Sequence, residues 1–129
     1  MVRLATVGVA LALLSGCGGG GTLSQKDLQK QYEAIQSLAA EGALVADGAA
    51  DGRTTETFVS VQSLYLSEAA GKIETDLRSA NGPQPAVSLA RRVAEDLDRL
   101  HEEPDDAELA RRLSEELQAS AADAEERAK

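Results

Sequence analysis

The most reactive side chain in this sequence is the thiol of Cys17, the one cysteine of the chain. A thiolate is a good nucleophile, so the residue is open to covalent modification. An intramolecular disulfide is excluded because no second cysteine is present. The thiol directly follows Ser15 and Gly16, two small residues that come after an apolar run from Leu4 to Leu14. Its position in the chain therefore matters more than its reactivity.

Arg3, the short apolar run and the small residues after it make up the parts of an export signal. The run is too short for a transmembrane helix, which needs roughly 20 apolar residues. The sequence Leu14-Ser15-Gly16-Cys17 resembles a lipobox, the cleavage and lipidation signal of bacterial lipoproteins. The resemblance implies cleavage between Gly16 and Cys17 and a diacylglyceryl group on the Cys17 sulfur. Two or three acyl chains, such as palmitate, would then hold the protein on a membrane.

The predicted domain organisation follows from this signal. Residues 1–16 are the lipoprotein signal peptide, 17–24 are the lipidated cysteine with a flexible glycine-rich tether, and 25–129 are a helical domain. The tether is predicted from the four glycines 18–21, because glycine runs are flexible. The alternative is an uncleaved apolar segment with an incidental thiol.

The sequence after Cys17 offers few residues that could bind a metal ion or haem. His101 is the one histidine, and no methionine follows Met1, so the usual pair of haem ligands is missing. A di-metal bundle site uses two Glu-x-x-His units, and Asp98-x-x-His101 is the nearest approach. We interpret His101 as a surface cation near a helix C-terminus. No metal site or cofactor is predicted.

A calcium loop can be compared with the segment that starts at Asp47. Asp47, Asp51 and Gly52 match positions one, five and six of an EF-hand loop. Ala49 and Phe58 stand where two further ligands are required. We therefore expect a turn that ends a helix.

Catalytic residues are equally hard to assemble. The sequence has no Gly-x-Ser-x-Gly motif, and His101 is the one histidine available as a base. Glu41, Glu68 and Glu74 are carboxylates of the kind that glycosidases pair across a cleft, but nothing in the sequence places two of them together. The prediction is that the protein is not an enzyme and has no catalytic residue.

The charge of the chain limits its partners. After removal of residues 1–16, 12 basic and 22 acidic side chains remain, a net charge of −10. Arg91-Arg92 and Arg111-Arg112 are isolated pairs within acidic segments, which indicates salt-bridged helix faces. This argues against a nucleic-acid partner, which would require a basic face. The expected partners are membrane lipid, through Cys17, and an envelope protein or cell-wall component.

Apolar and small residues recur at steps of three or four, which predicts an all-α fold. Helices are expected at 25–50, 54–80, 85–101 and 105–127, with no strand. The inward residues expected on the first helix are Leu28, Tyr32, Ile35, Ala39, Gly42, Ala46 and Ala49. Those on the third are Val87, Ala90, Val93, Leu97 and Leu100, and those on the fourth are Leu109, Leu113, Leu117, Ala121 and Ala124. Ser24 is a predicted N-cap, and Asp105 with Glu108 has the spacing of a capping box. The predicted architecture is a four-helix bundle of two antiparallel helical hairpins, placed after the tether.

The first hairpin suggests a register in which large residues meet small ones. Folding the chain at Gly52 places Phe58 opposite Ala46 and Tyr65 opposite Ala39. In the same register Ala69 lies opposite Ile35. The inward face of the second helix is then expected to hold Phe58, Val61, Tyr65, Ala69, Ile73 and Leu77. We predict that Phe58 is a core residue; the competing view makes it an exposed anchor for a partner.

These observations predict an exported lipoprotein with a non-catalytic helical domain for binding or structure. It would lie on the outer face of the cell membrane, or on the outer membrane of a two-membrane cell, because Gly18 stands where Asp would favour inner-membrane retention. The alternative is an envelope tether. The chain resembles the murein lipoprotein family in its lipidated cysteine, helical body and final Lys129, a possible peptidoglycan attachment point. It departs from that family in lacking a continuous heptad seam.

Overall fold

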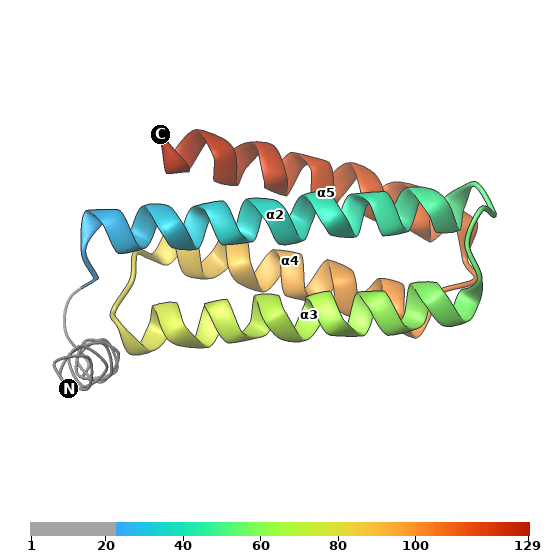
Figure 1. Ribbon diagram of the computed structural model, residues 1–129, viewed down its shortest axis with the longest axis horizontal. Helices are drawn as coiled ribbons and strands as arrows, with labels where there is room; N and C mark the ends of the chain where they lie inside the picture. The colour runs from blue at the N-terminus through green and yellow to red at the C-terminus, as the bar shows by residue number, and fades with distance from the viewer. Residues whose placement is uncertain (1–22) are drawn as a thin grey trace, which may run out of the picture.

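The computed structural model describes residues 23–129, which form four helices joined by short turns (Figure 1). The helices are α2 (Gln25–Ala50), α3 (Glu56–Ser79), α4 (Gln84–Glu102) and α5 (Ala107–Ala128). The described residues contain no strand, and the predicted all-α four-helix bundle is confirmed. Each helix begins and ends within two residues of its predicted boundary. The lipobox, Cys17 and the glycine-rich tether lie outside the described residues.

Side-chain caps fix where the helices begin. Ser24 Oγ accepts a hydrogen bond from the backbone N–H of Asp27 at 3.1 Å, which confirms the predicted N-cap of α2. The predicted cap of α5 is wrong by one residue. Asp106, and not Asp105, accepts from the N–H of Leu109 at 2.9 Å. The reason is that the turn after α4 extends through Asp105, so that α5 begins at Ala107.

Two residues with positive φ allow the chain to reverse between helices. Gly52 has φ 68° after α2, where the sequence predicted the turn. Asn81 has φ 54° after α3, and the next residue, Gly82, donates its N–H to the carbonyl of Leu77 at 2.7 Å. Pro85 then occupies the first turn of α4, where it displaces no helical hydrogen bond.

Consecutive helices run antiparallel, but only one consecutive pair, α3 with α4, is among the closely packed pairs. α2 packs mainly along α5, and α3 packs mainly along α4, as the paired ribbons of Figure 1 show. The contacts of α2 with α3 and of α4 with α5 are sparser. The bundle is thus two tightly packed helix pairs joined through a common core.

Small residues on α2 allow leucines of α4 and α5 to approach closely. A Cβ on Gly42 would lie 2.5 Å from Leu97 Cδ2 of α4 and 3.2 Å from Leu117 Cδ1 of α5. Ala39 and Ala46, on the same face of α2, are completely buried. Large side chains therefore meet small ones in this core, as expected, but they come from α4 and α5.

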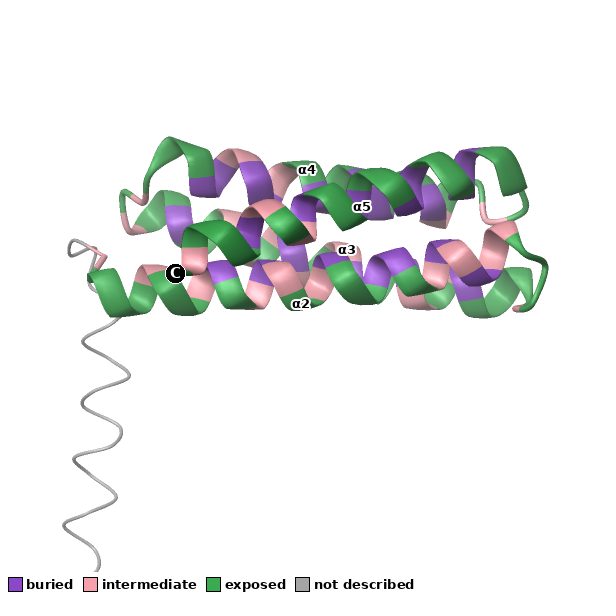
Figure 2. Ribbon diagram, turned by 90° about the horizontal axis from the view of Figure 1, so that it is seen from above, coloured by how far each residue is buried: buried purple, intermediate pink, exposed green. Residues whose placement is uncertain are grey.

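The buried residues recur as bands along each helix (Figure 2). The inward residues predicted for α4 are all buried: Val87, Ala90, Val93, Leu97 and Leu100. On α2, Tyr32, Ile35, Ala39, Gly42 and Ala46 are buried as predicted, and the two end residues of that face, Leu28 and Ala49, are half-buried. On α5, Leu109, Leu113, Leu117 and Ala124 are buried as predicted, and Ala121 is half-buried. Three of the four core faces were therefore predicted correctly.

The predicted inward face of α3 is wrong in the first half of the helix, whereas Leu77 in the second half is buried as predicted. Phe58 and Tyr65 are 45% and 69% exposed, so neither packs into the core over Ala46 or Ala39. The buried residues of α3 are Val59, Ser63, Leu66, Ala70 and Leu77. The helix is rotated from the predicted orientation because α3 turns toward α4, its main packing partner. Ala46 instead packs with Val59, one residue after Phe58.

The bundle has two distinct ends (Figure 1). At the entry end, α2 begins at Gln25 and α5 finishes at Ala128. At the distal end lie the turn between α2 and α3 and the turn between α4 and α5. A helix rises 1.5 Å per residue, so α2 separates the ends by roughly 40 Å.

Candidate functional site

His101 and Ser60 are the one pair of described residues that resembles a base with its nucleophile. Nδ1 of His101 lies 3.0 Å from Ser60 Oγ and 2.8 Å from the Ser60 carbonyl oxygen. A carbonyl oxygen only accepts, so Nδ1 carries the proton and donates to it. A protonated Nδ1 cannot take the proton of the Ser60 hydroxyl. The pair fastens α4 to α3, and the half-buried His101 is more enclosed than the surface cation that we predicted.

Asp96 of α4 is the most unusual titratable group. Its residue is 5% exposed, and Oδ2 is buried without a hydrogen-bond partner. Burial, and then the charge of Glu116 on α5, raise its pKa from 3.8 to about 6, although Arg99 and Arg92 act in the opposite direction. A raised pKa in a cleft can mark a general acid. Asp96 lies in a helix contact, so it lacks access to a substrate.

The aspartates of the calcium comparison serve structural purposes. Ser114 of α5 donates its hydroxyl to Asp47 Oδ1 at 2.6 Å and accepts from Gln118 at 2.9 Å. Asp51 forms an ion pair with Arg53 at 3.1 Å. Residues 23–129 contain no group of three or more His, Cys, Asp or Glu side chains placed to hold a metal ion. The contact between Asp47 and Ser114, which joins α2 to α5, was not predicted because 67 residues separate its members.

The three glutamates considered for acid–base chemistry do not form a pair across a cleft. Glu41 and Glu68 are exposed. Glu74 is half-buried, and its Oε2 pairs with Arg78 at 2.6 Å and with Arg91 of α4 at 3.1 Å. Arg91 thus forms an ion pair between helices rather than on the face of its own helix, and within residues 23–129 Arg92, Arg111 and Arg112 form none.

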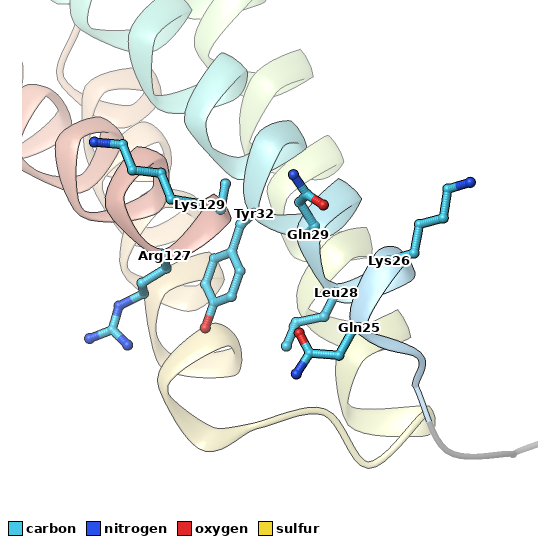
Figure 3. A pocket seen from close by; sticks show the side chains of 8 residues that line it. Gln25, Lys26, Leu28, Gln29, Tyr32, Arg127 and Lys129 are labelled. Atoms are coloured by element: carbon cyan, nitrogen blue, oxygen red, sulfur yellow. The ribbon is translucent and has the colours of Figure 1, made fainter.

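A hollow of about 300 Å³ lies at the entry end, around the ring of Tyr32 (Figure 3). Lys26, Arg127 and Lys129 line it, but their charged ends point in different directions and do not converge. Arg127 is engaged by Asp123 at 2.7 Å, and Lys129 by Glu126 at 3.3 Å. Cations that diverge and are paired with acids make a poor anion site. A second hollow, of about 400 Å³, is open to solvent between α3 and α4.

The feature that the core does not explain is a row of exposed apolar residues on α3. We call Phe58, Val61, Leu64 and Tyr65 the α3 stripe; they are 45%, 62%, 39% and 69% exposed. Steps of three and four place them on neighbouring turns of one helix face. Residues 57–67 contain no charged side chain, although 27% of the whole chain is charged. The stripe is therefore an uncharged surface with four exposed apolar side chains, in the distal half of the bundle.

The acidic charge is concentrated in the same half of the bundle. The half toward the entry end, residues 23–38, 68–93 and 118–129, carries eight basic and eight acidic side chains. The distal half, residues 39–67 and 94–117, carries four basic and fourteen acidic ones. Residues 23–129 have a net charge of −10, and all of it lies in the half that holds the α3 stripe.

Comparisons with family models, with curated proteins and with solved structures give no match. None of the helices in the described part of the chain is both long and apolar enough to cross a membrane.

The α3 stripe, in its acidic surroundings, is the candidate functional site. The sequence carried one signal for it, the absence of charged residues from 57–67, but we assigned Phe58, Val61 and Tyr65 of this segment to the core.

Proposed function

We propose that the protein is a bacterial lipoprotein, held on a membrane of the cell envelope through acylated Cys17. Its bundle is a non-catalytic binding domain that presents the α3 stripe to another envelope component. The anchor is supported by the lipobox-like sequence Leu14-Ser15-Gly16-Cys17. The binding role is supported by the α3 stripe, because an apolar patch rimmed by polar residues on a soluble domain typically marks an interaction site.

The exposed stripe is the observation that carries the binding role. Tyr65 and Phe58 are aromatic, and aromatic side chains are enriched among the residues that contribute most to interfaces. Both belong to a domain with only three aromatic residues in all. The third, Tyr32, is buried at the entry end.

The two ends of the bundle suit this arrangement. The tether would join the bundle at its entry end, before Ser24. The α3 stripe starts at Phe58, the third residue of α3, at the distal end. At 1.5 Å per residue, Phe58 and Tyr65 lie roughly 32 and 21 Å from Ser79, where α3 reaches the entry end. A partner could reach the stripe without contact with the lipid surface.

The tether function through Lys129 finds no comparable support. Lys129 lies beside Gln25 and Lys26 at the entry end. A tether across the envelope uses the length of its body only when its two attachment points lie at opposite ends. With both at the entry end, the bundle would add nothing to the reach between membrane and peptidoglycan.

Photo-crosslinking in cells tests the binding role. A benzophenone amino acid replaces Tyr65 in the full-length protein, and in a matched variant it replaces Leu44. Leu44 is 71% exposed, and it precedes Asp47, which faces α5, by one helical turn. We expect a discrete adduct from position 65 and none from position 44. The same adducts from both positions, or none from either, would remove the support for a binding surface on α3.

A further inference from the structure

We propose that the α3 stripe docks a basic amphipathic helix that belongs to a partner protein. This inference rests on the binding role proposed above and specifies the chemistry of the partner. Three properties of the stripe lead to it: its shape, the charges at its two ends and the charge of the distal half.

The shape of the stripe suits a helix. Phe58, Val61 and Tyr65 follow one another at three and four residues along a straight helix. A second helix laid beside α3 presents its own apolar residues at the same spacing, so that two such rows interdigitate. The charge-free segment 57–67 spans about three turns of α3. We therefore expect the partner to supply apolar residues at i, i+3, i+4 and i+7.

The ends of the stripe specify the charge of the partner. Glu56 precedes the charge-free segment and Glu68 follows it, and both side chains are exposed. Their positions differ by twelve residues, which corresponds to roughly 18 Å along the helix axis. Lys or Arg in the first and last turns of the docked helix would meet these acids. The excess of acidic groups in the distal half also attracts a basic segment from a distance.

A second copy of this chain fits the stripe less well. Two copies related by a two-fold axis pack α3 against α3 in antiparallel orientation. The register that places Phe58 of one copy on Tyr65 of the other brings Glu56 next to Glu68. Like charges then meet at both ends of the contact, and two acidic halves approach each other. An anionic membrane surface is disfavoured by the same net charge.

The affinity is expected to be moderate. A helix that covers three turns of α3 buries less than the roughly 800 Å² per partner of a standard interface. Interfaces below that size are typical of transient complexes, so we expect a dissociation constant in the micromolar range.

The test is a titration of the full-length protein, held in nanodiscs of neutral phosphatidylcholine. The probe is a labelled synthetic helix of about 16 residues with leucines at i, i+3, i+4 and i+7 and lysines in its end turns. A second peptide carries glutamates in place of the lysines, and a third has the first composition in scrambled order. The protein variants are Tyr65→Ser in the stripe and Leu44→Ser as the control, because their exposed fractions are 69% and 71%.

We expect saturable binding of the basic helix by the wild-type protein, and at least tenfold weaker binding by Tyr65→Ser. Leu44→Ser should match the wild type within about twofold. A rise in NaCl from about 50 to 500 mM should weaken binding several-fold, because salt screens exposed charges. Unchanged circular dichroism of Tyr65→Ser confirms that its fold is intact.

Three results would overturn the inference: equal binding of the glutamate peptide, equal binding by Tyr65→Ser, or no saturable binding of the basic helix. If sedimentation shows that the wild-type protein is a dimer and that Tyr65→Ser is a monomer, the stripe binds a second copy of this chain. Binding to anionic vesicles lost in Tyr65→Ser would assign it to lipid. The crosslinking experiment distinguishes failure of the basic-helix inference from failure of the binding role proposed above. An adduct at position 65 with a negative titration rejects only the basic helix, whereas the absence of both rejects the binding role as well.

Discussion

Replacement of Asp96 by asparagine should change how the stability of the bundle depends on pH. In the folded state, burial among α4 and α5 and the nearby Glu116 raise the pKa of Asp96 from 3.8 to about 6. Because the folded pKa lies above the unfolded one, the protonated carboxyl favours the fold. This contribution is complete below pH 3.8 and is lost as the pH rises through 6. This difference between the folded and unfolded pKa of Asp96 corresponds to about 3 kcal/mol in the free energy of unfolding.

The assay is urea unfolding of wild type and Asp96→Asn from pH 3.5 to pH 8, with the free energies of unfolding compared at each pH. Asparagine cannot ionise, so the variant lacks the pH-dependent term. We expect its stability relative to wild type to rise by about 3 kcal/mol between low and high pH. The other carboxylates titrate in both proteins and cancel in the difference. Any change that burial of the asparagine amide makes to the free energy of unfolding of the variant is the same at every pH, because the amide does not titrate.

Asp98→Asn is the matched control, because Asp98 is exposed and lies two residues away on the same helix. Its stability relative to wild type should stay within about 0.5 kcal/mol, the usual range for surface substitutions. If the difference between Asp96→Asn and wild type does not vary with pH, the reasoning is refuted. Asp96 would then be solvated, and its unpartnered Oδ2 would have another explanation.

Two further substitution pairs test the packing. Gly71→Ala should stabilise the protein by about 0.5–1 kcal/mol in thermal melts, because a Cβ there meets nothing within 4 Å and alanine favours a helix. Gly42→Ala should destabilise it by about 1–2 kcal/mol, because the new Cβ displaces the fully buried Leu97; a stabilised Gly42→Ala would contradict the close approach of α2 and α4. Phe58→Ala should lower the free energy of unfolding by about 1 kcal/mol, and Leu97→Ala by about 2–5 kcal/mol. If Phe58→Ala and Leu97→Ala lower the free energy of unfolding equally, Phe58 is a core residue.

The helix boundaries were predictable because local signals determine them. Ser24 caps α2, Gly52 provides the positive φ after it, and Pro85 marks the first turn of α4. Each of these effects acts within a few residues of the chain. The core faces of α2, α4 and α5 were also predictable, because each has one dominant apolar face.

The orientation of α3 was not predictable in the same way, because this helix has two adjacent apolar faces. One holds Phe58, Val61 and Tyr65, and the other holds Val59 and Leu66. The first has the larger side chains, and we therefore assigned it to the core. The buried face also includes Ser63, whose polar side chain concealed it. The choice depends on the packing of α3 along α4, which involves residues distant in sequence.

For the same reason the candidate site entered the sequence analysis only as the competing view that Phe58 is an exposed anchor for a partner. The charge-free segment 57–67 was visible in the sequence, but it became a surface only when the rotation of α3 was known. The distribution of charge between the two halves also required the antiparallel course of the helices. In the linear sequence the acidic residues of 41–56 and 94–117 are far apart.

Attachment of the bundle to a membrane through Cys17 is tested most directly by metabolic labelling with a radioactive or clickable fatty acid in the bacterial host. Wild type and Cys17→Ser are expressed at equal levels, isolated from the membrane fraction and compared. The predicted result is label on the wild type alone, with the variant retained as a larger, uncleaved precursor. Equal labelling of the two proteins, or no label on either, would contradict the lipoprotein assignment.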